Sequence, residues 1–247
     1  MDCDVEEPNA HIFLRPRLEE WRPVSIPTPE VDPGLCSGCG ECSAMCQYHA
    51  IVVVGQNALV FPALCNGCGG CRLVCPGKAI AEVPREIGVI EHGAAGPMQF
   101  TQGVLNVGEA RAAPIIREMA SEATGNSVIL DVPPGTSCPA VESVRTADYV
   151  LLVTEPTPFG LHDLELAAGM VRELAKPFGV VVNRADAGDG RVQAYCAAEG
   201  IPVLLQIPDS RETAEAYSRG ELAAVAVYGY ATSMEILYRH LLQEVHA

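Results

Sequence analysis

Two segments of the chain share one cysteine spacing, and this repeat constrains the fold more than any other feature of the sequence. Residues 35–51 read LCSGCGECSAMCQYHAI and residues 64–80 read LCNGCGGCRLVCPGKAI. A leucine, four cysteines, two glycines, an alanine and an isoleucine recur at an offset of 29 residues. A repeat at a fixed offset predicts two copies of one supersecondary unit. Each copy has the form C-x2-C-x2-C-x3-C, and its cysteines are Cys36, Cys39, Cys42 and Cys46 in the first copy and Cys65, Cys68, Cys71 and Cys75 in the second.

This spacing is that of the bacterial ferredoxin run. Three closely spaced cysteines let one loop hold three corners of an iron–sulfur cube, and in two-cluster ferredoxins the fourth ligates the other cube. Glycines between the cysteines permit the tight backbone and let amide N–H groups point at sulfur. The sequence therefore predicts two [4Fe–4S] clusters, the first on Cys36, Cys39, Cys42 and Cys75 and the second on Cys65, Cys68, Cys71 and Cys46.

A structural zinc site and a disulfide framework are the alternatives for these cysteines. Zinc sites use four ligands, typically as two separated CxxC pairs, which fits two ferredoxin runs poorly. The chain has 11 cysteines, an odd number, and its first residues, MDCDVEEPN, contain no secretory signal. Disulfides are therefore not expected. The first run has Gln47 where the second has Pro76, a departure from the motif that removes no ligand.

The composition argues against several classes of partner. The formal net charge of −15 disfavours a nucleic-acid binder, which needs a basic patch, and disfavours docking on anionic lipid. No apolar run reaches the roughly 18 residues that a membrane span needs. We therefore expect a cytoplasmic protein without a nucleic-acid partner and without a membrane span.

Prolines flank the cysteine module, at residues 23, 27, 29 and 33 before it and at residue 84 after it, and predict linkers at both edges. Residues 87–92 and 98–104 predict a hairpin joined by a Gly-rich turn. A helix is expected over residues 107–123, with Pro114 either kinking it or delaying its start.

The remainder of the sequence alternates between apolar runs and helical patterns. The runs are unbroken, which predicts strands buried on both faces of a parallel sheet, at residues 128–131, 150–154, 180–183 and 203–207. The helices are expected at residues 160–176, 191–199 and 232–244. This order predicts an α/β fold with a doubly wound, mostly parallel sheet, in which ligands bind at the carboxyl ends of the strands. Asp131, Thr154 and Asn183 lie at such ends.

Taken together, these motifs resemble the MinD/Mrp-type P-loop ATPases that carry an inserted ferredoxin domain with two [4Fe–4S] clusters. The resemblance implies a P-loop-like domain, incomplete at its N-terminus, over residues 1–30 and 85–247, with the insert at 31–84. DCDVEEPN resembles the second strand and switch I, where Asp4 would face the phosphates and the attacking water. Asp131 in LDVPPGT resembles the aspartate that holds Mg²⁺. Asn183 in NRAD resembles the adenine-contacting asparagine, and Pro208 and Asp209 resemble the loop over the base.

A strand-terminal aspartate also suits a helix cap, and a strand-terminal asparagine is also a common turn residue. Asp186 is expected to serve the turn. Cys138 is expected to be a structural or regulatory thiol rather than a ligand of a bridging cluster.

The phosphate loop of that family, KGGxGKT, is absent from this sequence. The pair Gly77-Lys78 lies inside the second cysteine run, with Arg72 where the motif needs glycine and Ala79 where it needs a hydroxyl. That loop cradles the phosphates and holds Mg²⁺, so ATPase activity of this chain alone is left open. We expect a truncated chain; the rival is a short form that lost ATPase function or pairs with a partner that supplies the loop.

The favoured function is low-potential electron transfer through the two clusters, coupled in the complete protein to ATP and Mg²⁺. The resemblance implies a homodimer or a pair with a homologue, and electron transfer implies a redox protein partner. Two alternatives are a plain electron carrier on an inactive α/β scaffold and a carrier that delivers iron–sulfur clusters to other proteins.

Overall fold

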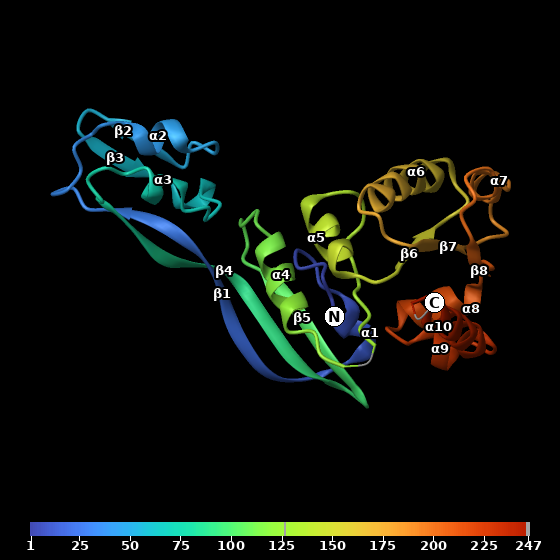
Figure 1. The fold of residues 1–247 in the computed structure, drawn as a ribbon. Coiled ribbons are helices and arrows are strands. Elements are labelled where there is room, and N and C mark those ends of the chain that lie inside the picture. Colours follow the sequence, from blue (N-terminus) through green and yellow to red (C-terminus); the bar gives the residue numbers. More distant parts are fainter. Residues whose placement is uncertain (126, 246–247) are drawn as a thin grey trace.

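The computed structural model describes residues 1–125 and 127–245 of the 247-residue chain. Within these residues the strands form three sheets, with the orders β1-β4-β5, β2-β3 and β6-β7-β8. The first sheet belongs to an N-terminal body, the second to a small cysteine-rich domain, and the third to a C-terminal body (Figure 1). None of the helices in this part of the chain has the length and apolar character needed to cross a bilayer.

The N-terminal body is an antiparallel sheet covered by one helix. Its strands are β1 (Arg17–Val31), β4 (Ile80–Ala95) and β5 (Met98–Leu105), and the short helix α1 (Ala10–Leu14) precedes them. The predicted hairpin is confirmed as β4 and β5. The helix α4 (Ala113–Ser121) begins later than residue 107 because Pro114 lies in its first turn, where a missing N–H costs nothing.

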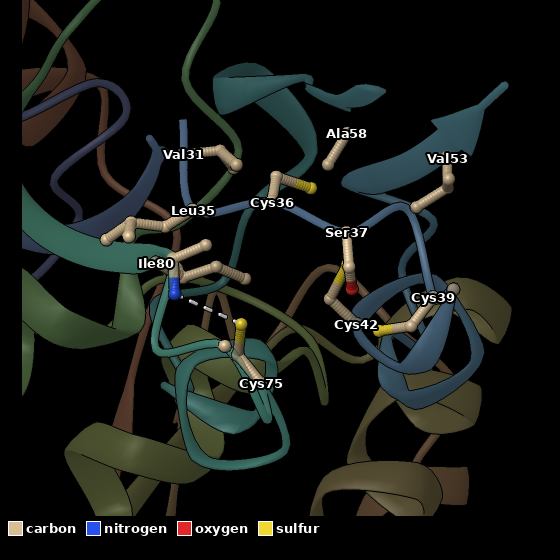
Figure 2. A pocket seen from close by; sticks show the side chains of 13 residues that line it. Val31, Leu35, Cys36, Ser37, Cys39, Cys42, Val53, Ala58, Cys75 and Ile80 are labelled. Atoms are coloured by element: carbon tan, nitrogen blue, oxygen red, sulfur yellow. Dashed lines mark hydrogen bonds between the residues drawn. The ribbon is translucent and has the colours of Figure 1, made fainter. Parts of the chain in front are cut away.

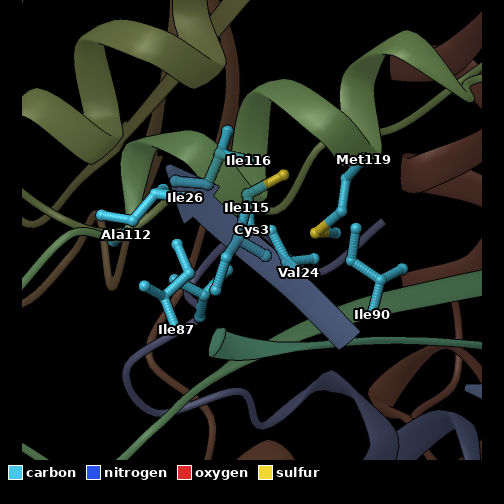
Figure 3. Packing of buried hydrophobic residues seen from close by; sticks show 10 residues of the cluster. Cys3, Val24, Ile26, Ile87, Ile90, Ala112, Ile115, Ile116 and Met119 are labelled. Atoms are coloured by element: carbon cyan, nitrogen blue, oxygen red, sulfur yellow. The ribbon is translucent and has the colours of Figure 1, made fainter. Parts of the chain in front are cut away.

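The core of this body lies between α4 and the strands (Figure 3). Ile115, Ile116 and Met119 on α4 are buried against Ile87 and Ile90 of β4. The helix approaches the sheet closely at Gly103, where an added Cβ would lie 2.8 Å from Ile115 Cγ2. The chain therefore needs a residue without a side chain at this position of β5.

A long two-stranded ribbon joins the N-terminal body to the cysteine-rich domain (Figure 1). β1 and β4 pair from Arg17↔Ala94 to Val31↔Ile80, so the proline-rich edges predicted as linkers are strands instead. That prediction was wrong because β1 is an edge strand throughout and β4 has a free edge before Gly88, and the outward N–H groups of such edges need no partner and tolerate proline. The domain boundaries at residues 30/31 and 84/85 fall inside these two strands.

The cysteine-rich domain is built from short elements between the two ends of the ribbon. They are the helix α2 (Glu41–Met45), the strands β2 (Ile51–Val54) and β3 (Asn57–Val60), the single 3₁₀ turn η1 (Pro62–Leu64) and the helix α3 (Gly70–Leu73). A small core of Cys42, Ile51 and Ile80 joins the domain to the end of the ribbon.

The C-terminal body contains the parallel sheet. β6 (Val150–Thr154), β7 (Phe178–Asn183) and β8 (Val203–Ile207) lie where strands were predicted, and β7 pairs parallel with both neighbours. The predicted helices are confirmed as α6, α7 and α10, and α5, α8 and α9 were not predicted. The helix bounds are α5 (Cys138–Thr146), α6 (Pro158–Glu173), α7 (Arg191–Ala198), α8 (Arg211–Ser218), α9 (Ala223–Ala226) and α10 (Tyr230–Val245).

The fourth expected strand, residues 128–131, does not join this sheet. Its backbone pairs with the N-terminus instead: Asp131 N–H donates to Met1 O, and Cys3 N–H donates to Asp131 O, both at 2.8 Å. Its other edge and the outer edge of β6 are both open among the described residues, and Ile129 and Val153 are 74% and 65% exposed. The parallel sheet predicted as continuous is therefore split between residues 129–131 and β6.

Truncation of the buried helix side chain Ile115 should destabilise the N-terminal body. Ile115 is fully buried, and an isoleucine-to-alanine change in a core costs about 2–5 kcal/mol because it leaves a cavity. Ile115→Ala should lower the midpoint of urea unfolding, while Ile236→Ala at an exposed position of α10 should leave it nearly unchanged. Equal midpoints for the two variants would contradict the packing in Figure 3.

Candidate functional site

Two cavities in the cysteine-rich domain are lined by the repeated cysteines, and Figure 2 shows the first of them. Each takes three thiols from one run and a fourth from the other. The first cavity is lined by Cys36, Cys39, Cys42 and Cys75, and the second by Cys65, Cys68, Cys71 and Cys46. The empty space, counted with its opening to solvent, is about 350 Å³ in the first cavity and about 430 Å³ in the second.

Backbone amides donate to the cysteine sulfurs at equivalent places in the two runs. Ala50 N–H donates to Cys46 Sγ at 3.3 Å. Ala79 N–H donates to Cys75 Sγ, also at 3.3 Å, and Figure 2 shows this second bond. Gly67 N–H donates to Cys65 Sγ at 3.4 Å. Hydrogen bonds to sulfur tune the potential of a bound cluster.

The backbone is bent to make these bonds. His49 and Lys78, one residue before the donating amides, have φ of 51° and 50°, in the left-handed region that only a few per cent of non-glycine residues adopt. Gly67 has φ of 69° and lies so close to the ribbon that an added Cβ would be 3.1 Å from Pro27 O. The local geometry is therefore specified by the sulfurs rather than by the preferences of these residues.

The thiols differ in burial. Burial raises the pKa of Cys42 and of Cys71, which occupy equivalent positions of the repeat. Cys39 and Cys68 are exposed at the mouths of the two cavities. A cluster binds thiolates, so cluster loading would displace protons from Cys42 and Cys71.

The donor set fits two [4Fe–4S] clusters. Four thiols surround each cavity, and three of the sulfurs already accept amide N–H bonds. Across residues 1–125 and 127–245, no three or more His, Cys, Asp or Glu side chains are arranged to hold a single metal ion. The arrangement suits a polynuclear group with one thiolate at each corner.

A group of carboxylates lies where the N-terminus meets residues 129–131. Desolvation and the neighbouring Asp2 and Asp4 carboxylates raise the pKa of Asp131, and desolvation also raises the pKa of Asp4. Asp2 was missed by sequence reasoning. It is buried, and its carboxylate accepts the N–H groups of Asp4, Asn9 and Ala10 at 2.9–3.1 Å. The alternation of Asp2 and Asp4 around the buried Cys3 was the signal.

The residues predicted near the base lie at the carboxyl ends of β7 and β8. Asn183 pairs with Ile207, and Pro208 and Asp209 follow directly. Asp209 N–H donates to Asp186 Oδ1 at 2.6 Å, so Asp186 fastens the loop. The Asp209 carboxylate accepts from Arg184 Nε at 3.0 Å. Arg184 was not predicted. This pair lies in the C-terminal body, whereas the carboxylates of Asp2, Asp4 and Asp131 lie beside the N-terminal sheet. The roles of both groups toward a nucleotide stay predictions.

Three further cysteines lie outside the cavities. Cys3 and Cys196 are buried in the cores of the two bodies, and burial raises the pKa of Cys3 to about 11. Cys138 is exposed at the start of α5.

Comparison with known proteins gives one match to the cysteine-rich domain and several longer matches along the chain. The 4Fe-4S binding domain family matches residues 29–52. Two uncharacterized proteins of Methanocaldococcus jannaschii are similar: one is 29% identical, covering 90% of this chain and 78% of its own length, and the other is 34% identical, covering 66% and 58%. The iron-sulfur cluster carrier protein of Aquifex aeolicus is 29% identical over 109 residues, covering 38% of this chain and 30% of its own length.

Among solved structures, the septum site-determining protein MinD of Pyrococcus horikoshii, in complex with Mg-ADP, has a TM-score of 0.51 at 14% identity. The match covers 96% of this chain and 78% of that chain, and shows a shared fold. The chain therefore has a MinD-like α/β fold, and the domain match supports iron–sulfur binding in the cysteine-rich domain. The shared fold agrees with the resemblance that the sequence motifs predicted.

The close approach at Gly67 gives a test of the cavity geometry. Gly67→Ala would add a Cβ against Pro27 and Ile26 at a left-handed backbone position, so it should lower cluster content. Gly55→Ala is the matched control, because Gly55 has φ of +64° in the same domain with nothing within 4 Å of the added atom. Both changes carry the backbone penalty of roughly 1–2 kcal/mol, and only Gly67→Ala adds the clash.

The measurement is iron and acid-labile sulfide per chain after anaerobic reconstitution. Equal losses in Gly67→Ala and Gly55→Ala would show that backbone strain alone decides, and that the close packing on the ribbon does not matter.

Proposed function

We propose that this chain is an electron-transfer protein whose residues 31–84 hold two [4Fe–4S] clusters. The observation that carries the proposal is the crossed lining of the two cavities. Each cavity takes its fourth thiol from the opposite run, which is the arrangement of two-cluster ferredoxins. Eight thiols in two closed sets support permanent rather than transient binding.

The residues around the cavities have distinct tasks in this proposal. A bound cluster gains and loses one electron at a potential set by ligand type, hydrogen bonds to sulfur and solvent exposure. The amides of Ala50, Ala79 and Gly67 stabilise the negative charge on sulfur. Pro27, Pro29 and Glu82 of the ribbon line the second cavity, and Val31 and Ile80 at the ribbon's end line the first. The second cavity thus lies nearer the N-terminal body.

We propose coupling to ATP and Mg²⁺ only for the complete protein, one in which a phosphate loop is supplied. The shared fold supports this, as do the unpaired edges of residues 129–131 and of β6 among the described residues. Asp4 and Asp131 would then act on the phosphates and Mg²⁺, and Asn183, Pro208 and Asp209 on the base. A redox protein partner, a dimer or a pair with a homologue, and a cytoplasmic location belong to the same proposal.

Serine substitution of single cysteines tests the crossed ligation. Cys75→Ser should impair the same cluster as Cys36→Ser, although Cys75 belongs to the other run, because both line the first cavity. Cys46→Ser should likewise match Cys65→Ser. The wild-type chain should bind about eight iron atoms, and EPR of the reduced variants shows which signal is lost.

If Cys75→Ser instead reproduced the spectrum of Cys65→Ser, each run would hold its own cluster and the crossed assignment would be wrong. Chains that bind about one metal ion, without sulfide and without an EPR signal on reduction, would refute the iron–sulfur proposal itself.

Delivery of clusters to other proteins is the second candidate, favoured by one observation. The similar protein of Aquifex aeolicus is named an iron-sulfur cluster carrier protein. Delivery needs ligands that release the cluster, whereas each cavity here has four thiols and the domain is packed on its own ribbon. Incubation of the loaded chain with an apo-ferredoxin should therefore leave the iron on the donor, with free iron–sulfide as the control source. Rapid, complete transfer under chelator would favour delivery instead.

A further inference from the structure

The cysteine-rich domain depends on a narrow connection to the rest of the molecule. β5 pairs with β4 only over Gly88–Ala95. From Arg85 back to Ile80, toward the cysteine-rich domain, the ribbon therefore has two strands. A two-stranded ribbon twists readily and is marginally stable by itself. Its ladder alone does not fix how the domain faces the N-terminal body.

Arg111 makes a second connection, from the loop before α4. Its Nη2 donates to Ala63 O in η1 at 2.7 Å. The side chain of Arg111 is 13% exposed. Ala63 precedes Cys65 by two residues, which span at most about 7 Å of chain, so the guanidinium lies close to the backbone of a ligand in the second cavity.

Glu109 orients this arginine. Its carboxylate pairs with Arg111, accepts the N–H groups of Ala110 and Arg111, and accepts from Arg85 Nη1 of the ribbon at 2.6 Å. Burial alone would raise the pKa of Glu109, but the hydrogen bonds from Arg85 and Ala110 hold it below its usual range. Its side chain is only 5% exposed. One carboxylate thus holds the ribbon, its own loop and Arg111 together.

The network has more positive charge than it neutralises internally. Two guanidinium groups share one carboxylate, and three buried nitrogens, Arg85 Nε and Nη2 and Arg111 Nε, have no hydrogen-bond partner among the described residues. A buried positive charge without full compensation is costly unless an anion lies near. An all-thiolate cluster is an anion, and its reduction adds a further negative charge.

We propose that Arg111, oriented by Glu109, is a positioning residue that holds the cysteine-rich domain on the N-terminal body and stabilises the reduced cluster of the second cavity; this rests on the proposed two-cluster function. Reduction of that cluster strengthens the attraction to the network, and oxidation weakens it. The docking of the domain is thereby linked to the charge of the cluster nearer the body.

EPR-monitored redox titration of the reconstituted chain is the test. Arg111→Ala should lower the reduction equilibrium constant of one cluster about tenfold, a shift of 59 mV for a one-electron couple, and leave the other cluster nearly unchanged. Arg172→Ala is the matched control, since it removes a surface arginine that pairs with Glu199 in the C-terminal body. It should change neither potential.

Arg111→Lys separates charge from structure. Lysine keeps the positive charge but loses the forked guanidinium geometry. The reduction equilibrium constant should therefore stay within a factor of two or three of wild type, while amide exchange at Leu64 and Cys65 becomes faster. A loss of potential as large as in Arg111→Ala would show a purely structural effect and overturn the electrostatic role.

The two proposals fail in distinguishable ways. Two intact signals with unchanged potentials in Arg111→Ala would overturn the role of Arg111 and leave the clusters standing. Absence of both signals in the wild-type chain would overturn the proposed function.

Discussion

The backbone ladder between β1 and β4 is the constraint on which the rest of the structure depends. One end of it contributes Val24, Ile26, Ile87 and Ile90 to the core of the N-terminal body, and its other end, at Val31 and Ile80, closes the cysteine-rich domain. The domain is therefore an insertion whose two ends must leave and re-enter the body side by side. Antiparallel pairing meets this requirement without a separate linker.

Much of the fold could be predicted because its signals are local. Unbroken apolar runs located β6, β7 and β8, and the cysteine repeat indicated an iron–sulfur domain. The proline-rich edges misled, because proline breaks a strand only where its missing N–H faces a partner, and pairing partners are not written in the neighbouring residues. Residues 128–131 have the composition of a central strand, but their partner in the structure is the N-terminus, more than a hundred residues away in sequence.

The candidate site likewise contains residues that local sequence predicted and residues that only tertiary contacts bring together. Short chain distances within each run predicted three of the thiols that share a cavity, and the crossed pattern of two-cluster ferredoxins predicted the fourth. Asp2 was overlooked since its function is to accept backbone N–H groups, for which the sequence offers only the alternation of Asp2 and Asp4 around Cys3. Arg85, Glu109 and Arg111 are ordinary surface residue types, and only folding brings the loop before α4 to the ribbon and to Ala63. Networks of this kind arise from tertiary contact and carry no periodicity that a sequence could show.

The length of the free ribbon has a mechanical consequence. Residues 26–31 extend beyond the three-stranded sheet and, at about 3.3 Å per residue, form an arm roughly 20 Å long. A rotation of about 10° at the base of such an arm displaces its tip by roughly 3–4 Å. The first cavity lies at the tip of the arm, and the second lies along the arm, closer to the N-terminal body. A small change of angle in the N-terminal body thus displaces the first cavity further than the second.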